Sequence, residues 1–216
     1  MRIFLLTAFA ACLFSTTVLA DETPAPVTPA PAAETPAPQP AGNPPMTGPK
    51  VMIQTSMGDI TLQLDEVHAP LTVRNFIRYV RERHFDGTCI YRVMKGFVVQ
   101  MGSFDATGKG RGVHDGIVSE SNNGLKNLRG TLAMAHGDGA TSTMAEFFIN
   151  LADNAALDHQ ASDTGTATGY TVFAQVVDGM DVVDKIAEVP VKDGGPMAGT
   201  IFPVTPITLN RVSVLP

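Results

Sequence analysis

The 216-residue sequence contains no tryptophan, only two cysteines (Cys12 and Cys89) and no run of lysine and arginine. Two cysteines cannot form a disulfide framework or a zinc knuckle. The formal net charge is −6, and without a clustered basic face we expect no nucleic acid partner. No apolar run reaches the ~20 residues that a transmembrane helix needs. The chain is 44% apolar and 17% charged, so most of it can build a core, and its length favours one domain or at most two small ones.

Residues 1–20 have the pattern of a secretory signal peptide. A positive start at Arg2 precedes a twelve-residue apolar run at 3–14, and the small-residue stretch that follows ends at Ala20. The pattern predicts cleavage after Ala20 and a periplasmic protein. A second interpretation is a lipoprotein signal with a lipid attached to Cys12. After cleavage at Ala20 only Cys89 remains in an oxidising compartment, where a single cysteine is safest when buried.

Residues 21–49 hold ten of the sixteen prolines and almost no large apolar side chain. Such a composition favours extended polyproline II structure and cannot form a core. We interpret this segment as a Pro/Ala-rich disordered linker that holds the following domain away from a surface or partner. A proline-rich docking ligand is the alternative.

Residues 50–216 predict one mainly β domain. Turn signals and apolar stretches predict eight strands, at 51–55, 60–64, 89–94, 97–101, 131–135, 147–151, 171–177 and 207–214. A Gly58-Asp59 turn is expected between the first two. Helical spacing predicts one helix that opens at Ala69-Pro70, with its basic face in solvent, and a second at 180–188. Many short strands with two helices favour a closed antiparallel barrel, which leaves no sheet edge exposed.

Common catalytic signatures are missing from this domain. It has no G-x-S-x-G elbow, no H-E-x-x-H and no P-loop, and the five histidines show no metal-ligand spacing. The candidate that stands out is Arg92, an arginine inside an apolar strand pair. Strand alternation places it on one face with Met94 and puts Tyr91 and Val93 on the other. A buried arginine needs an acceptor, which Gln100 can supply; alternatively, its stem packs on the barrel while its head reaches water.

Several stretches resemble the cyclophilins, the peptidyl-prolyl cis–trans isomerase family. They occur in the family's order and spacing over residues 50–216: 85–88, 91–100, 130–135, 147–149, 157–158 and 172–173. Residues 123–127 and the insert-like stretch 159–169 look like the bacterial periplasmic branch. The resemblance implies a closed eight-stranded antiparallel cyclophilin-like barrel capped by two α-helices, which agrees with the strand count. It also implies an isomerase that works non-covalently, without a metal or another cofactor.

The resemblance also implies roles for individual residues. Arg92 and Gln100 are the implied catalytic pair: Arg92 donates to the prolyl nitrogen, and Gln100 orients its guanidinium. The implied substrate-binding residues are Phe97, Val98, Ala135, His136, Phe148, Leu157 and Tyr170. Ala135 and His136 are expected to act through their backbone groups, with the His136 side chain facing solvent.

Three positions depart from the family pattern. Glu146 stands where the family usually has glutamine, and we expect it either to accept a hydrogen bond from Arg92 or to face water. Val98 is smaller than the usual methionine. Ala156 stands where many members have tryptophan or phenylalanine, and because the tryptophan form is associated with cyclosporin binding, we expect weak cyclosporin binding here.

The resulting hypothesis is a peptidyl-prolyl cis–trans isomerase that accelerates rotation about Xaa-Pro bonds and assists the folding of exported proteins. Its expected partners are unfolded or flexible proline-containing polypeptides, and the expected oligomeric state is a monomer. The alternative is a cyclophilin-fold chaperone or binding module with little or no isomerase turnover.

Overall fold

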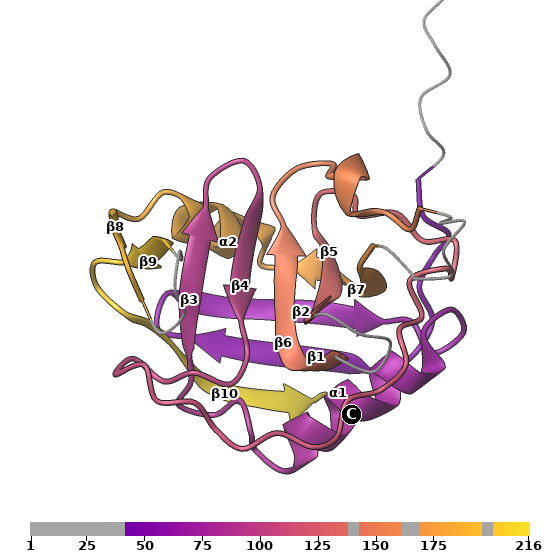
Figure 1. Cartoon of the computed structure of the whole chain (residues 1–216), viewed down its shortest axis with the longest axis horizontal. Helices are drawn as coiled ribbons and strands as arrows, with labels where there is room; N and C mark the ends of the chain where they lie inside the picture. The colour runs from indigo at the N-terminus through magenta and orange to yellow at the C-terminus, as the bar shows by residue number, and fades with distance from the viewer. Residues whose placement is uncertain (1–41, 138–142, 161–168, 196–200) are drawn as a thin grey trace, which may run out of the picture. The chain divides into compact units, whose positions relative to one another are not determined.

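The computed structural model describes residues 42–137, 143–160, 169–195 and 201–216. Within them, eight strands pair throughout in antiparallel fashion and close into a barrel in the order β1-β10-β3-β4-β6-β5-β7-β2 (Figure 1). This confirms the predicted fold class. The barrel strands are β1 (Lys50–Thr55), β2 (Gly58–Leu64), β3 (Cys89–Met94), β4 (Val98–Met101), β5 (Thr131–His136), β6 (Thr143–Asn150), β7 (Thr171–Asp178) and β10 (Ile207–Val214).

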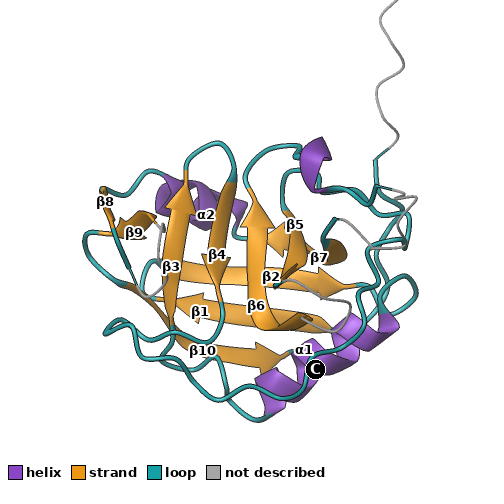
Figure 2. Ribbon diagram, viewed as in Figure 1, coloured by secondary structure: helices purple, strands orange, loops and turns teal. Residues whose placement is uncertain are grey.

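Two α-helices pack against the barrel, α1 (Pro70–Arg81) and α2 (Met180–Ala187) (Figure 2). Proline begins α1, where its missing N–H costs nothing. The N-cap residue of α1, Ala69, offers no side-chain cap. Glu120 replaces it from a distant loop, because its carboxylate accepts from the N–H groups of Leu71 and Thr72 at 3.1 and 2.8 Å. Among the described residues no helix is long and apolar enough to cross a membrane.

The barrel interior is filled by side chains that alternate along each strand. Phe147 and Ile149 of β6 point inward, whereas Phe148 between them lies in a separate cluster on the outer face. Phe76 of α1 closes one side of the interior, where it contacts Phe147 and Phe173. The outer face of β4, β5, β6 and β7 is therefore free to build a site without opening the core.

Several predicted boundaries were wrong. The first hairpin turns at Ser56-Met57 rather than at Gly58-Asp59, which belong to β2. Gly58 is needed for packing instead, because a Cβ there would lie 2.9 Å from a methyl group of Val182 in α2. Strand β6 begins four residues earlier than predicted. The sequence analysis also missed a small outer sheet and a 3-10 helix: β8 (Val191–Asp193), β9 (Ile201–Pro203) and η1 (Ala155–Leu157).

The end of the predicted linker packs on the barrel. The Asn43 amide donates to the carbonyl of Lys126 and accepts from its N–H, at 2.9 and 2.8 Å. Met46 is only 9% exposed and belongs to the outer-face cluster. Described structure therefore begins before Lys50, which is where the composition changes. The predicted signal peptide and residues 21–41 of the linker lie outside the described residues.

Candidate active site on the outer face of the barrel

A bulge in strand β3 determines where Arg92 points. Ile90 pairs with Met101, but Arg92 already pairs with Gln100, so β3 advances two residues while β4 advances one. Tyr91 lies in an outer cluster with Cys89, whereas Val93 lies in the barrel interior. The predicted common face of Tyr91 and Val93 is thus wrong, because simple alternation cannot anticipate a bulge.

Arg92 and Gln100 are joined as a pair across the two strands. The Arg92 Nη1 group donates to Oε1 of Gln100 at 3.1 Å. The guanidinium carbon lies 5.9 Å from the ring centroid of Phe97, within range of a cation–π contact. Both residues of the pair are half-buried. The guanidinium is therefore held in place, and the bond to Gln100 uses one of its five N–H donors.

An apolar patch lies beside this pair and contains the predicted binding residues. We call it the outer-face patch; its members share one cluster and are Phe97, Val98, Ala135, Phe148, Leu157 and Tyr170. Phe148 is only 4% exposed and forms its floor, while Leu157 and Tyr170 are half-buried at its rim. Phe148 and Gln100 pair directly between β6 and β4, so the floor and the polar pair are neighbours. The structure thus brings these predicted residues to one face.

His136 takes part in this face through its side chain, contrary to the expected solvent-facing position. Its ring stacks on Tyr170 with the centroids 4.7 Å apart. Nε2 lies 3.0 Å from the carbonyl oxygen of Gly169, and Nδ1 lies 2.9 Å from that of Gly137. Tyr170 in turn meets Phe148 edge-on at 5.3 Å. His136 therefore supports the aromatic rim of the patch.

A buried amide network, which the sequence analysis missed, holds the loop that carries Leu157. The Asn127 side chain donates to the Leu157 carbonyl at 3.0 Å, and its backbone N–H donates to Asp158 at 2.7 Å. Asn150 on β6 donates to Asn127 at 3.2 Å. Because Asn127 bonds both to Asn150 and to the loop residues, the loop is fixed relative to β6. Leu157 therefore keeps its place beside Phe148 although it lies outside the barrel strands.

Glu146 occupies neither of the two positions expected for it. One carboxylate oxygen accepts from the N–H of Ser103 at 2.8 Å, and the other is buried and meets no hydrogen-bond partner among the described residues. The same holds, within these residues, for the buried Tyr91 hydroxyl. Burial raises the pKa of Glu146, and nearby donors on Tyr91 and Ser103 only partly oppose this effect. A Cβ at Gly102 would overlap the Glu146 carboxylate and crowd the Glu146 backbone, so glycine is required there.

We expect Glu146→Gln to stabilise the protein at neutral pH. When folding raises the pKa of a carboxyl group, the folded protein becomes less stable as pH rises from the unfolded pKa of about 4.5 through the folded pKa. Glutamine carries no charge and can donate a hydrogen bond to the Tyr91 hydroxyl. One such hydrogen bond contributes on the order of 1 kcal/mol to the free energy of unfolding, or about 2–4 °C in Tm for a chain of this size.

Thermal unfolding of the parent and the variant between pH 4 and pH 8 checks this expectation. The difference in Tm should be small at pH 4 and widen toward pH 8. Glu66→Gln, at an exposed glutamate, is the matched control and should show no widening. A Glu146→Gln variant that is less stable than the parent at pH 8 would contradict the assignment of a buried, poorly satisfied carboxylate.

Cys89 lies in the outer cluster with Tyr91, apart from the outer-face patch. Cys89 is buried in β3, and burial raises its pKa to about 11, so its thiolate is scarce at neutral pH. Within the described ranges no group of three metal-ligating side chains converges. Arg92 remains the donor best placed to act on a ligand at the outer-face patch.

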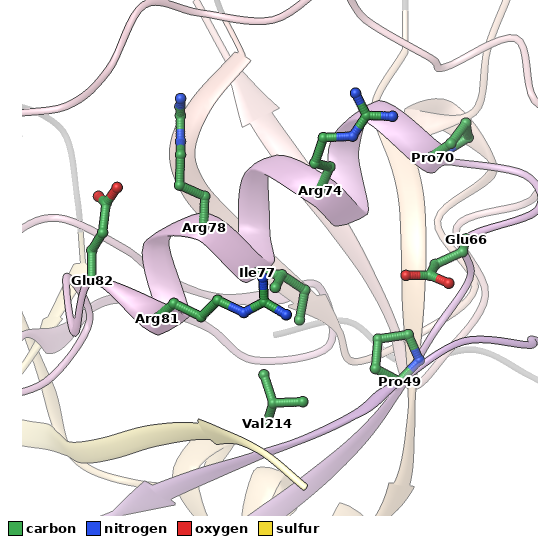
Figure 3. Close-up of a pocket in the computed structure, with 9 residues that line it drawn as sticks. All are labelled: Pro49, Glu66, Pro70, Arg74, Ile77, Arg78, Arg81, Glu82 and Val214. Atoms are coloured by element: carbon green, nitrogen blue, oxygen red, sulfur yellow. The ribbon is translucent and has the colours of Figure 1, made fainter. Parts of the chain in front are cut away.

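A separate pocket lies along α1, and the predicted site residues do not line it. Arg74, Arg78 and Arg81 come from successive turns of the helix and border this pocket (Figure 3). Pro49 and Val214 close its other side. Two of its exposed arginines have no partner side chain among the described residues that fixes them toward an aromatic floor, whereas the outer-face patch sets an arginine held by Gln100 beside Phe148. We therefore place the candidate site at the outer-face patch.

Comparison with known proteins agrees with the barrel fold described above. Residues 50–214 match the family model described as cyclophilin type peptidyl-prolyl cis-trans isomerase/CLD. The chain is 41% identical over 169 residues to peptidyl-prolyl cis-trans isomerase A of Dickeya dadantii, covering 78% of this chain and 86% of that protein. It is 46% identical over 136 residues to peptidyl-prolyl cis-trans isomerase B of Escherichia coli, covering 63% of this chain and 82% of that protein.

A solved structure shares the fold at lower sequence identity. It is a cyclophilin type peptidyl-prolyl cis-trans isomerase of Cryptosporidium parvum, determined in the presence of the dipeptide Ala-Pro. The TM-score is 0.62 at 22% identity, and the match covers 77% of this chain and 99% of that chain.

Proposed function

Because the chain belongs to the cyclophilin-type peptidyl-prolyl cis–trans isomerase family, whose members work without a cofactor, we propose that Arg92 and the outer-face patch carry the reaction. The main observation behind this proposal is the position of the Arg92 guanidinium, which Gln100 holds beside the floor formed by Phe148. The reaction rotates a peptide bond and breaks none. Its barrier for an Xaa-Pro bond is about 20 kcal/mol and comes from amide resonance.

Arg92 lowers this barrier by favouring the twisted bond over both planar forms. As the bond twists, the lone pair localises on the prolyl nitrogen, and the guanidinium donates a hydrogen bond to it. Gln100 holds the donor in place beforehand, so little reorganisation is needed during rotation. A barrier lower by about 7 kcal/mol corresponds to a rate roughly 10⁵-fold higher.

The outer-face patch holds the proline ring while the preceding residue rotates. Phe148 forms the floor, and Leu157 and Tyr170 stand at the rim. The substrate class is a flexible polypeptide with an exposed Xaa-Pro bond, since an open patch does not require a folded partner. The Cryptosporidium parvum relative was determined with Ala-Pro, which is consistent with this class.

Isomerisation of a short Xaa-Pro peptide near 10 °C tests the proposal, because uncatalysed rotation takes tens to hundreds of seconds even at 25 °C. We expect the chain to accelerate it strongly. Peptide binding is measured in parallel. Binding without acceleration would support the alternative, a chaperone or binding module, and would contradict the mechanism.

We propose that the protein is exported and assists the folding of exported proteins. The signal pattern of residues 1–20 supports this proposal. Mass spectrometry of the protein from a periplasmic fraction should find a chain that begins at Asp21, and a lipidated N-terminal Cys12 would support the lipoprotein interpretation instead. In a refolding assay, catalytic amounts should speed a client whose slow step is Xaa-Pro rotation.

Weak cyclosporin binding is a further expectation, and it depends on Ala156. Ala156 is exposed on η1, directly before Leu157, and offers one methyl group where an aromatic ring would bury about 150–250 Å². We expect Ala156→Trp to raise cyclosporin affinity at least tenfold by calorimetry. Ala155→Trp, its exposed neighbour, is the control and should leave affinity unchanged. A tight complex with the parent chain would contradict this expectation.

A further inference from the structure

The solvent-facing side of α1 is basic, although the chain as a whole is acidic. The helix contains three arginines, Arg74, Arg78 and Arg81, and no aspartate or glutamate, whereas the chain carries a formal net charge of −6. All three arginines are exposed and border the pocket along α1 (Figure 3). Like charges on successive turns of one helix repel each other, so a bound anion stabilises this arrangement.

Arg78 is held in position by a buried side chain. Its Nη2 group donates to Oδ1 of Asn75 at 3.0 Å, and its guanidinium carbon lies 5.5 Å from the ring centroid of Tyr79. Asn75 is only 5% exposed, and its own amide donates to the carbonyl of Met144 in β6 at 2.6 Å. The barrel thus orients Asn75, and Asn75 orients the guanidinium of Arg78 before any ligand binds.

The other two arginines border the pocket without a partner. Neither Arg74 nor Arg81 takes part in a hydrogen bond or an ion pair with the described part of the chain. The carboxylate of Glu82, at one end of the pocket, lies 2.6 Å from Nε2 of His114. Glu66 stands at the other end (Figure 3). The middle of the pocket is therefore positively charged, and a carboxylate stands near each end.

The pocket has an apolar side and the length of a short peptide. Pro49 and Val214 lie opposite α1, and Ile77 is on the side of the helix that faces them (Figure 3). The pocket encloses about 880 Å³. The 12 residues of α1 span about 18 Å, and an extended chain rises about 3.3 Å per residue. Five or six residues of an extended peptide therefore cover roughly the length of the helix.

We propose that the pocket along α1 is a docking groove for a short acidic segment of a partner polypeptide, bound in extended form. Its carboxylates accept hydrogen bonds from Arg74, Arg78 and Arg81, because a planar guanidinium can form two parallel bonds with a carboxylate. Its apolar side chains pack against the opposite wall. The residues of the outer-face patch do not line this groove, so the inference does not depend on the proposed isomerase function.

The two carboxylates at the ends favour a peptide over a larger polyanion. A nucleic acid strand or an anionic membrane carries its negative charge past both ends of the groove, where it meets Glu66 and Glu82. Like charges that are brought together at an interface oppose binding of the wrong partner. A segment with only a few acidic residues places its charge in the middle, next to the arginines.

Fluorescence anisotropy at low salt with a labelled peptide, Gly-Asp-Glu-Leu-Asp-Gly, tests this inference. The peptide contains no proline, so its binding is independent of isomerase activity. We expect saturable binding, and a peptide with amides in place of the carboxylates, Gly-Asn-Gln-Leu-Asn-Gly, should bind at least tenfold more weakly. Arg78→Ala should raise the Kd of the acidic peptide at least tenfold, because it removes the guanidinium that Asn75 holds. Arg211→Ala, at an exposed arginine of β10 that does not line the groove, is the control and should leave the Kd unchanged.

Nuclear magnetic resonance titration of the isotope-labelled chain locates the bound peptide. The amide signals of α1 and of Val214 should shift, while those of Phe148 and Tyr170 in the outer-face patch should not. Shifts centred on the outer-face patch would assign the carboxylates to Arg92 instead and overturn the proposal. Arg78 is exposed, so its variant should keep the parental Tm, and Arg74→Ala should weaken binding in the same direction.

Other results would also overturn the proposal. If the acidic peptide does not bind, or if the amide peptide binds equally well, the groove does not recognise carboxylates. An unchanged Kd in both Arg78→Ala and Arg74→Ala places the peptide elsewhere. Tighter binding of a single-stranded oligonucleotide or of phosphatidylglycerol vesicles, lost in Arg78→Ala, assigns the groove to phosphate groups rather than to an acidic polypeptide.

Discussion

Arg92→Ala is expected to lower kcat/KM for a short Xaa-Pro peptide at least a hundredfold, about 2.7 kcal/mol in the transition state. The guanidinium is already bound to Gln100 and lies over Phe97, so in the proposed mechanism it needs no further ordering before it donates to the twisting bond. Alanine leaves the apolar floor in place and removes only the donor. The loss should therefore fall mainly on kcat, with peptide binding largely retained. The peptide isomerisation assay near 10 °C measures it.

Two further variants make this prediction specific. Arg92→Lys keeps the charge but loses the planar fork that serves both Gln100 and the substrate, so we expect it to recover little of the activity. Arg211→Ala removes an exposed arginine of β10, outside the outer-face patch, and should leave kcat/KM unchanged. An Arg92→Ala variant with more than a tenth of the parental activity would contradict the assigned role.

Phe76→Ala is expected to cost about 3–5 kcal/mol of unfolding free energy. Phe76 has no exposed surface, and its ring lies 5.1 to 5.3 Å from those of Phe85, Phe147 and Phe173. These rings join α1 to the barrel strands, so truncation opens a cavity that close-packed neighbours cannot fill. Chemical denaturation measures the loss, which should appear as a lower midpoint with an unchanged slope.

Phe76→Leu is the matched control for this cavity. Leucine refills most of the space, and the cost should be below about 1.5 kcal/mol. If Phe76→Ala lost no more stability than Phe76→Leu, the ring cluster would not be the packing centre that connects α1 to the barrel.

The sequence analysis predicted most accurately the strands that have a clear turn signal at each end. Strands β3 and β10 run over the predicted residues, because glycine or proline turn signals bound them and their apolar content is high. Strand β6 was predicted too short, since Thr143, Met144 and Ala145 follow a glycine-rich stretch and carry weak strand signals. The short strands β8 and β9 are held by pairing with each other, which sequence alternation alone does not report.

The candidate site was predictable in its residues but less so in its geometry. The resemblance named Arg92, Gln100 and Phe148, and the structure places them on neighbouring strands, with Gln100 paired to both of the others. The bulge beside Arg92 and the burial of Glu146 against Ser103 depend on neighbours far apart in sequence. The sequence analysis did not predict that Met46 is buried against the barrel, because a proline-rich composition masks a single buried side chain. Long-range packing decided each of these positions.

The most direct test of the central claim is the cis–trans exchange rate of an Ala-Pro peptide at equilibrium, measured by exchange spectroscopy with catalytic amounts of the parent chain or of Arg92→Ala. Exchange cross-peaks within a one-second mixing time for the parent, and none for the variant, are the predicted result, because uncatalysed exchange takes tens to hundreds of seconds. Equal exchange with both proteins would show that Arg92 does not carry the reaction, and no exchange with either would contradict the proposed isomerase activity.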